Sequence, residues 1–409
     1  MVLQLNKSVL SSGNTIQITG SKSESNRVLL LQSLFDNIQI ENCSNADDRL
    51  VLKKALCQNT KTVDVHHAGT AMRFLTAFYA IQKGRETILT GSSRMKERPI
   101  KVLVEALQSL GAEINYLENE GYPPLYIKGS ELKGASVKLQ ANVSSQYISA
   151  LLLIAPVLKN GLVVSLIGEV TSVPYIKMTL SLLSKVGVVT SFEGSVITVA
   201  PIVNTKKQLQ KIVIESDWSS ASYYYSCIAL SSLGTTIKLS SYKKDSLQGD
   251  ACLSELYKHL GVSTKFEEHS IILTKTDHAQ EEVSFNLINS PDIAQTIAVS
   301  CFGLGIACNL IGLHTLKIKE TDRLVALKVE LEKFGAQVSI SNDSLSVNKS
   351  KIIKEGVVID TYQDHRMAMA FAPLALKTSF YINNPEVVTK SYPDFWEDLK
   401  GIGFQALKI

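Results

Sequence analysis

Charged side chains are concentrated in two short segments, and their spacing points to chemistry on an anionic substrate. Glu320 and Arg323 are three residues apart, and Lys319 and Arg323 are four apart, so on a helix these three side chains share one face. A second segment, residues 91–99, holds three more cations in a loop before a predicted helix. Arg and Lys are the usual receptors for phosphate and carboxylate. A solvated charged surface is the simpler alternative for either segment taken alone.

Further cations lie beside the starts of predicted helices. Lys22 and Arg27 flank one such start, Arg73 follows another and Arg366 follows a third. Ser, Thr and Asp at these starts are individually explained as N-caps. A cation near a helix N-terminus opposes the helix dipole, however, so its repeated presence there calls for a bound anion.

The helices that carry these residues form a repeat. Their starts are 46, 75, 75, 73 and 73 residues apart, at Ser23, Gly69, Ser144, Ser219, Asp292 and His365. A second series of helices ends in a Gly or Asn that suits a left-handed cap, at Asn59, Gly111, Gly187, Gly261, Gly335 and Gly403. About thirty residues separate each of these ends from the next start, except between residues 59 and 69. The first unit should therefore lack one β-hairpin.

Each unit is predicted to have the order βαβαββ. The first helix is apolar nearly all round, as in residues 147–155, and should be buried, whereas the second helix, as in residues 322–331, has a polar face. A chain of 409 residues exceeds one hydrophobic core, so we expect two α/β domains of three units each. Within a domain three helix N-termini would emerge on one face, and two such faces would meet at a cleft that attracts anions.

Composition excludes several other classes of protein. A net charge of +4 is too small to indicate nucleic-acid binding, and the six cysteines show no metal-ligand spacing. No signal peptide, transmembrane run, P-loop or dinucleotide fingerprint is apparent. We therefore expect a cytoplasmic protein with no membrane or nucleic-acid partner, and no metal and no dependence on ATP or NAD is indicated.

The motifs together resemble those of 5-enolpyruvylshikimate-3-phosphate (EPSP) synthase, the 3-phosphoshikimate 1-carboxyvinyltransferase of aromatic amino-acid biosynthesis and the target of glyphosate. The resemblance rests on residues 20–27, 68–73, 95–99, 144–146, 319–323 and 364–369. It implies two inside-out α/β barrels, residues 21–213 and residues 1–20 with 214–409, with a hinge near residue 20 and at residues 204–214. It also implies a monomer that transfers the enolpyruvyl group of phosphoenolpyruvate to the 5-hydroxyl of shikimate 3-phosphate and releases phosphate.

The same resemblance implies roles for individual residues. Asp292, Glu320 and Lys22 would be catalytic, the first taking the hydroxyl proton and the second protonating the methylene carbon, although the sequence leaves open which carboxylate carries which proton. The residues expected to bind shikimate 3-phosphate are Lys22, Ser23, Arg27, Ser144, Ser145, Gln146, Ser172, Tyr175, Asp292, Thr315 and Lys319. Those expected to bind phosphoenolpyruvate are Lys22, Gly69, Arg98, Gln146, Glu320, Arg323, Arg366 and Lys390.

Three positions depart from the family pattern. His67 replaces a usual Asn, Phe74 a common Pro, and Thr315 begins a segment that differs from the frequent Asn-Trp-Arg. The first two bear on phosphoenolpyruvate and glyphosate, the third on shikimate 3-phosphate. Two rival readings are an enolpyruvyl transferase acting on UDP-N-acetylglucosamine, which typically carries a Cys in the loop at residues 91–99, and a catalytically inactive protein that only binds a phosphorylated metabolite.

Overall fold

The protein is described here by a computed structural model, which covers residues 1–132, 135–140, 144–168, 170–202 and 209–409. It divides into two compact units. The N-terminal unit is Ser21–Ile214, and the C-terminal unit is Met1–Gly20 together with Glu215–Ile409. Residues 204–208 of the expected hinge lie outside the described residues. Among the residues described, no helix is long and apolar enough to cross a membrane.

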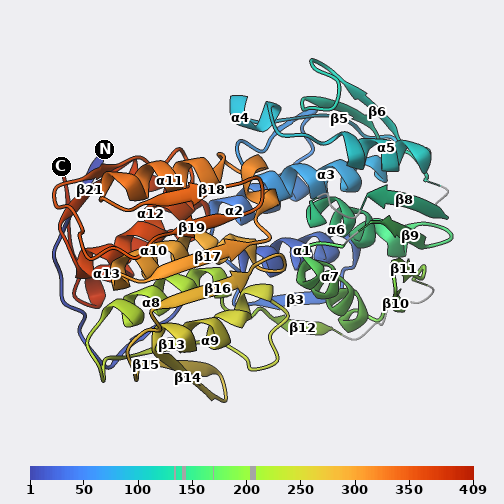
Figure 1. The fold of residues 1–409 in the computed structure, drawn as a ribbon. Coiled ribbons are helices and arrows are strands. Elements are labelled where there is room, and N and C mark those ends of the chain that lie inside the picture. Colours follow the sequence, from blue (N-terminus) through green and yellow to red (C-terminus); the bar gives the residue numbers. More distant parts are fainter. Residues whose placement is uncertain (133–134, 141–143, 169, 203–208) are drawn as a thin grey trace. The chain divides into compact units, whose positions relative to one another are not determined.

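The N-terminal unit contains three sheets and seven α-helices among its described residues (Figure 1). Its helices are α1 (Lys22–Leu34), α2 (Asp47–Cys57), α3 (Gly69–Ala80), α4 (Ser93–Lys96), α5 (Lys101–Ser109), α6 (Ser145–Ile154) and α7 (Val173–Lys185), with a 3-10 helix η1 (Ala155–Val157). Its strands are β3 (Ile38–Glu41), β4 (Thr62–Asp64), β5 (Glu86–Thr90), β6 (Glu113–Tyr116), β7 (Leu125–Lys128), β8 (Ser136–Gln140), β9 (Leu162–Ile167), β10 (Thr190–Glu193), β11 (Val196–Val199) and β12 (Gln210–Val213).

The C-terminal unit also contains three sheets, each of four strands. Its helices are α8 (Trp218–Leu230), α9 (Leu253–Leu256), α10 (Ala294–Leu304), α11 (Arg323–Lys333), α12 (His365–Phe371) and α13 (Phe395–Gly401), with 3-10 helices η2 (Gly249–Cys252), η3 (Tyr257–Leu260), η4 (Pro291–Ile293), η5 (His314–Ile318), η6 (Ala372–Leu376) and η7 (Pro385–Lys390). Its strands are β1 (Val2–Asn6), β2 (Asn14–Ile16), β13 (Thr236–Ser240), β14 (Val262–Glu267), β15 (Ser270–Lys275), β16 (Glu282–Asn286), β17 (Ala307–Ile311), β18 (Val338–Ile340), β19 (Leu345–Val347), β20 (Val358–Ile359), β21 (Phe380–Asn383) and β22 (Gln405–Lys408).

Among the described residues, five of the six sheets share one pattern, a parallel pair of strands continued by two antiparallel strands. In one of them β16 runs parallel to β17, which pairs antiparallel with β19, and β19 pairs with β18. The sixth sheet, among the described residues, holds only the parallel pair of β3 and β12. Strand β4 follows α2 directly, where the second to fifth units insert a hairpin, so the predicted truncation of the first unit is confirmed.

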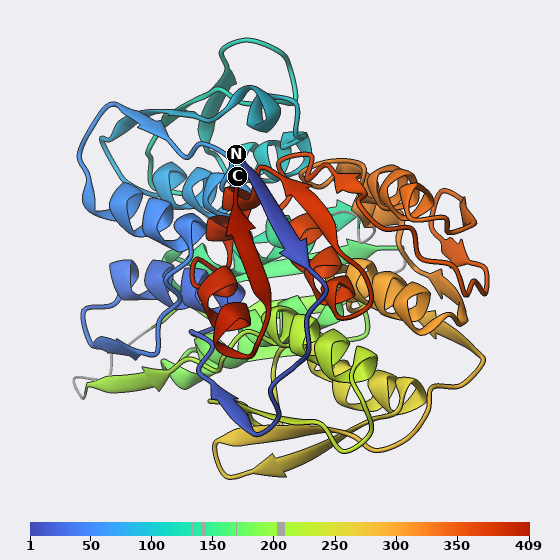
Figure 2. The same ribbon diagram turned by 90° about the vertical axis from the view of Figure 1, so that its left-hand side faces the viewer.

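The two chain termini meet in one sheet of the C-terminal unit. Strand β1 lies between β21 and β22 and is antiparallel to both, which Figure 2 shows from the side of the termini. A non-local exchange completes two other sheets: the strand before α1 pairs with the strand after α8, and the strand before α8 pairs with the strand after α1. The repeat is therefore closed by pairings between distant parts of the chain.

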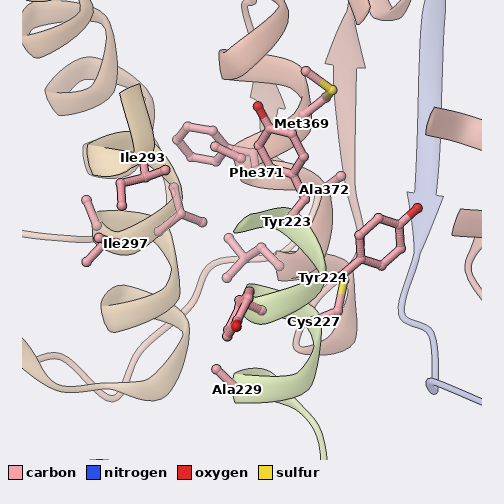
Figure 3. Close-up of a cluster of buried hydrophobic side chains, with 14 of the residues drawn as sticks. Tyr223, Tyr224, Cys227, Ala229, Ile293, Ile297, Met369, Phe371 and Ala372 are labelled. Carbon is pink, nitrogen blue, oxygen red and sulfur yellow. The ribbon is translucent and has the colours of Figure 1, made fainter. Parts of the chain in front are cut away.

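The first helix of each repeat is buried. In the C-terminal unit α10 contacts both α8 and α12, and α8 and α10 also contact strands of neighbouring sheets. Tyr223, Ile297 and Phe371 belong to the apolar cluster at this centre (Figure 3), and each is at most 1% exposed. Burial of one such side chain stabilises the fold by about 2 kcal/mol. Three units of sheet and buried helix in each half match the predicted α/β class.

The predicted helix ends are correct at five of six positions. Gly111, Gly187, Gly261, Gly335 and Gly403 all have φ between 78° and 105°, the left-handed conformation that glycine adopts without steric cost. Asn59 does not adopt it, because α2 already ends at Cys57 and its cap residue Gln58 is extended. The truncated unit thus lacks the turn that leads into the missing hairpin.

Candidate functional site

One cluster of ion pairs gathers the charged residues that were predicted in the C-terminal unit. They come from separate elements. Asp292 lies in η4, Lys319 and Glu320 precede α11, and Arg323 is the first residue of α11. Arg366 lies in the first turn of α12, and Lys390 is the last residue of η7. The members predicted from the sequence are Asp292, Lys319, Glu320, Arg323, Arg366 and Lys390.

Arg323 is the centre of this cluster. Its side chain is only 2% exposed, and its guanidinium donates from Nη1 to Asp292 Oδ1 at 2.9 Å and from Nη2 to Glu320 Oε2 at 2.8 Å. Its Nε donates to Asp364 Oδ2 at 2.6 Å. Burial alone would lower the pKa of Arg323, but Asp364, Glu320 and Asp292 raise it, so the group remains charged. A guanidinium presents five donors in a fixed planar fork, so it can bind three carboxylates at once and hold them in defined directions.

Asp292 is held in the ionised state by cations on two sides. Its Oδ1 lies 3.5 Å from Lys319 Nζ and its Oδ2 lies 3.2 Å from Arg366 Nη2. Burial would raise the pKa of Asp292, but Arg366, Lys319 and Arg323 together lower it well below its ordinary value. Burial in turn lowers the pKa of Lys319.

Glu320 has a separate lysine partner. Its Oε1 accepts from Lys390 Nζ at 2.7 Å, and the Lys390 side chain is 4% exposed. Each of the two candidate catalytic carboxylates is therefore bound by Arg323 and by a lysine of its own. The cations can receive phosphate and carboxylate groups, and the carboxylates can exchange protons.

In the N-terminal unit Arg27 joins three helices. Its Nε donates to Thr179 Oγ1 at 2.8 Å, its Nη2 to Ser149 Oγ at 2.9 Å and its Nη1 to the carbonyl of Ser23 at 2.8 Å. The guanidinium also lies 5.7 Å from the ring centroid of Tyr175. Burial lowers the pKa of Arg27 to about 10. The hydrogen-bond partners are all uncharged oxygens, so a nearby anion would stabilise this cation.

The starts of α3 and α6 are joined by Gln146. Its Nε2 donates to Thr70 Oγ1 at 3.2 Å. The guanidinium of Arg98 lies directly on Gly69, since a Cβ added there would be 2.5 Å from Arg98 Nη1. A cation held against backbone N-H groups at a helix start is suited to bind an anion.

The other predicted residues are placed as follows. Lys22 pairs with Asp48 at 3.4 Å, and Ser144 caps α6 by accepting from the N-H of Gln146. Ser172 precedes α7 with a left-handed φ of 54°. Ser145 is buried at the start of α6.

Thr315 is the predicted residue that the cluster does not include. It lies in η5, and none of the hydrogen bonds or ion pairs described above joins it to the cluster around Arg323.

Several residues of these networks were absent from the predicted site. Asp364 binds Arg323, Asp48 binds Lys22, and Ser219, which contacts Arg366 Nη2 at 3.3 Å, donates to Asp250. Ser219 is one of the repeated helix starts and Asp364 directly precedes another, and that was a usable signal. Asp48 and Asp250 carry no such signal in the sequence.

Comparison with solved structures identifies the class of fold. The chain superposes on EPSP synthase from Acinetobacter baumannii with a TM-score of 0.80 over 100% of both chains, at 20% identity. It also superposes on the enolpyruvyl transferase NikO from Streptomyces tendae with a TM-score of 0.75, covering 99% of this chain and 98% of that one, at 14% identity. The chain thus has the fold of the enolpyruvyl transferases.

Sequence comparison identifies the family. Residues 51–399 match the family model of EPSP synthase (3-phosphoshikimate 1-carboxyvinyltransferase). A protein of that name from Bacteroides fragilis strain YCH46 is 46% identical over 95% of both chains, and one from Aliivibrio salmonicida is 35% identical over 94% of this chain and 96% of the relative. The chain belongs to the EPSP synthase family. This confirms the predicted family and the prediction of a transferase.

Proposed function

We propose that this chain transfers the enolpyruvyl group of phosphoenolpyruvate to the 5-hydroxyl of shikimate 3-phosphate, using Asp292 and Glu320 as proton carriers. Membership of the EPSP synthase family supports the reaction. The observation that carries the assignment is that both carboxylates are bound to Arg323 and each to its own lysine. Such a set combines anion receptors with groups that accept and donate protons.

The reaction is an addition followed by an elimination. The 5-hydroxyl oxygen attacks C2 of phosphoenolpyruvate and the hydroxyl proton goes to Asp292. Glu320, which enters this step in its protonated form, protonates the methylene carbon to give a tetrahedral intermediate. Glu320 then recovers a proton from the new methyl group as the C2–O bond to phosphate breaks. The hydroxyl proton held by Asp292 passes to the departing phosphate, whose charge Lys22 neutralises, so phosphate leaves as hydrogen phosphate and Asp292 returns to its carboxylate form. The product is an enol ether and inorganic phosphate.

The neighbours of the two carboxylates support this division of roles. Asp292 lies beside Lys319, which we assign to shikimate 3-phosphate, and Glu320 lies beside Lys390, which we assign to phosphoenolpyruvate. An anionic substrate bound to Arg366 and Lys319 would weaken their effect on Asp292, and its pKa would rise toward that of a useful base.

The proposed binding residues belong to both units. For shikimate 3-phosphate they are Lys22, Ser23, Arg27, Ser144, Ser145, Gln146, Ser172, Tyr175, Asp292, Thr315 and Lys319. For phosphoenolpyruvate they are Lys22, Gly69, Arg98, Gln146, Glu320, Arg323, Arg366 and Lys390. The proposal includes a monomeric, cytoplasmic enzyme that needs no metal or cofactor. Light scattering of the purified chain tests whether it is monomeric, and activity after exhaustive chelation tests whether it needs a metal.

A phosphate-release assay tests the function. Phosphate should appear only when phosphoenolpyruvate and shikimate 3-phosphate are both present, and omission of either should stop it. UDP-N-acetylglucosamine in place of shikimate 3-phosphate should give none. Release with the nucleotide sugar would support the sister transferase, and binding of shikimate 3-phosphate without release would support an inactive binding protein.

A further inference from the structure

Helix α11 contacts the segment before α12 at a second point, which is separate from the ion pairs around Arg323. Glu330 is seven residues after Arg323, so the two side chains lie on the same face two turns apart. The Glu330 side chain is fully buried. Its Oε1 accepts from the Tyr362 hydroxyl at 2.6 Å and its Oε2 from the backbone N-H of Asp360 at 3.2 Å.

The segment that Glu330 contacts is a strained turn. Tyr362 and Gln363 have φ of 52° and 55°, so two consecutive residues other than glycine adopt the left-handed conformation. Sterics disfavour that conformation for residues with a Cβ, and it persists only where surrounding contacts enforce it. The N-H of Asp364 donates to the carbonyl of Thr361 at 2.8 Å and closes the turn. Asp364 and Arg366 come directly after it.

Charged and polar neighbours hold the Glu330 carboxylate in place. Lys333 Nζ lies 2.7 Å from Glu330 Oε2 and 3.1 Å from Asp360 Oδ2, and Asn383 donates to the other oxygen of Asp360 at 2.7 Å. Burial and the Glu330 carboxylate both raise the pKa of Tyr362, so its hydroxyl keeps the proton that it donates. Lysine, carboxylate and phenol thus form one network on the side of the turn away from the ion-pair cluster.

We propose that Glu330, acting through Tyr362, is a positioning residue that fixes Asp364 and Arg366 for the binding of phosphoenolpyruvate. Two residues of α11 bind the turn, one at each end. Arg323 binds Asp364, and Glu330 binds Tyr362. Loss of the second contact lets the turn relax from its left-handed conformation and displaces Arg366. The inference rests on the proposed function, because it takes Arg366 as a receptor for phosphoenolpyruvate.

Two conservative variants test the proposal. Tyr362→Phe removes one hydroxyl from a residue that is 38% exposed, and Glu330→Gln keeps the shape of the side chain but removes its charge. Each should raise KM for phosphoenolpyruvate about tenfold, the equivalent of one hydrogen bond to a charged group, with KM for shikimate 3-phosphate changed less than twofold. A general loss of folding would reduce the active fraction without changing one KM selectively.

Two further variants serve as controls. Glu332→Gln alters an exposed ion pair with Lys328 on the same helix and should leave both KM values unchanged. Arg366→Lys should itself raise KM for phosphoenolpyruvate. If it does so while Tyr362→Phe and Glu330→Gln leave that KM unchanged, the positioning role is wrong. If Arg366→Lys also leaves it unchanged, the assignment of Arg366 in the proposed function is wrong instead.

Discussion

Asp364 fixes Arg323 with both carboxylate oxygens. Its Oδ2 accepts from Arg323 Nε at 2.6 Å, and its Oδ1 lies 3.3 Å from Arg323 Nη2. The same Oδ1 accepts the backbone N-H of Arg366 at 2.9 Å, so this one fully buried side chain both holds the central guanidinium and caps α12. The orientation of Arg323 toward Asp292 and Glu320 therefore depends on it.

We expect Asp364→Asn to separate these two roles. Asn caps a helix as well as Asp does, but it removes the charge that faces Arg323, and loss of one partner of a buried pair costs about 3 kcal/mol. Asp364→Ala loses the cap as well and should cost about 1 kcal/mol more. Urea unfolding of the three proteins measures both steps. Equal stability of the Asn variant and the unmodified chain would contradict the structural role of this pair.

Substitution of the two proton carriers should separate chemistry from binding. Asp292→Asn and Glu320→Gln keep the size of each side chain, so each should lower kcat by at least about 10²-fold, as expected for loss of a general acid or base. Affinity for shikimate 3-phosphate should remain within a few-fold, which calorimetric titration can measure. If both variants retain kcat within a few-fold of the unmodified chain, neither carboxylate has the proposed role.

Local patterns were enough to predict the repeat and most of the charged site. Helix starts such as Gly69 and His365, and the glycines that end helices, depend on neighbours in the chain, so their chemistry is visible in the sequence. The missing hairpin follows in the same way from the short interval after α2. These features need no knowledge of long-range contacts.

What escaped prediction depends on distant contacts. The partner of Arg323 at Asp364 is 41 residues away, and Asp48 meets Lys22 only because α2 packs on α1. Carboxylates at such positions look like any surface acid until tertiary structure buries them. The pairing of β12 with β3 is non-local in the same sense. The prediction at Asn59 was wrong for a local reason, because α2 ends at Cys57 and its cap residue is extended.

Asp250 should make stability depend on pH. Burial, followed by the charge of Asp292, raises the pKa of Asp250 to about 7. The folded chain then keeps a proton that the unfolded chain releases near pH 4, so this group's contribution to stability falls as pH rises from about 4 to about 7 and is constant above that. The free energy of unfolding of the unmodified chain should fall by about 3 kcal/mol between pH 5 and pH 8, measured relative to the Asp250→Asn variant, which does not titrate at this position.

Urea unfolding of both proteins at a series of pH values measures this difference. Asp292 does not interfere, because the surrounding cations hold its pKa well below the window. A difference in stability that stays constant from pH 5 to pH 8 would show that Asp250 is ionised throughout. Such a constant difference would mean that Arg366 stabilises the Asp250 carboxylate at least as much as burial penalises it.

The position of Arg98 should require a glycine at residue 69, because a larger residue would collide with the guanidinium. An added Cβ would be 2.5 Å from Arg98 Nη1 and 3.0 Å from Arg98 Cζ, and the guanidinium is the flexible end of its side chain. Gly69→Ala should therefore displace Arg98 without unfolding α3. We expect KM for phosphoenolpyruvate to rise about tenfold, as for loss of one charge-assisted hydrogen bond, while KM for shikimate 3-phosphate stays unchanged.

Gly401→Ala provides the matched control for Gly69→Ala. Gly401 also lies in a helix, α13, but an added Cβ there would meet no atom within 4 Å. Because Ala is the better helix former, this variant should leave both KM values unchanged and raise stability by at most about 1 kcal/mol. Steady-state kinetics and urea unfolding of the two variants distinguish the local displacement of Arg98 from a general effect of replacing glycine. If Gly69→Ala binds phosphoenolpyruvate as tightly as Gly401→Ala, then the position of Arg98 against the start of α3 does not determine how this substrate is held.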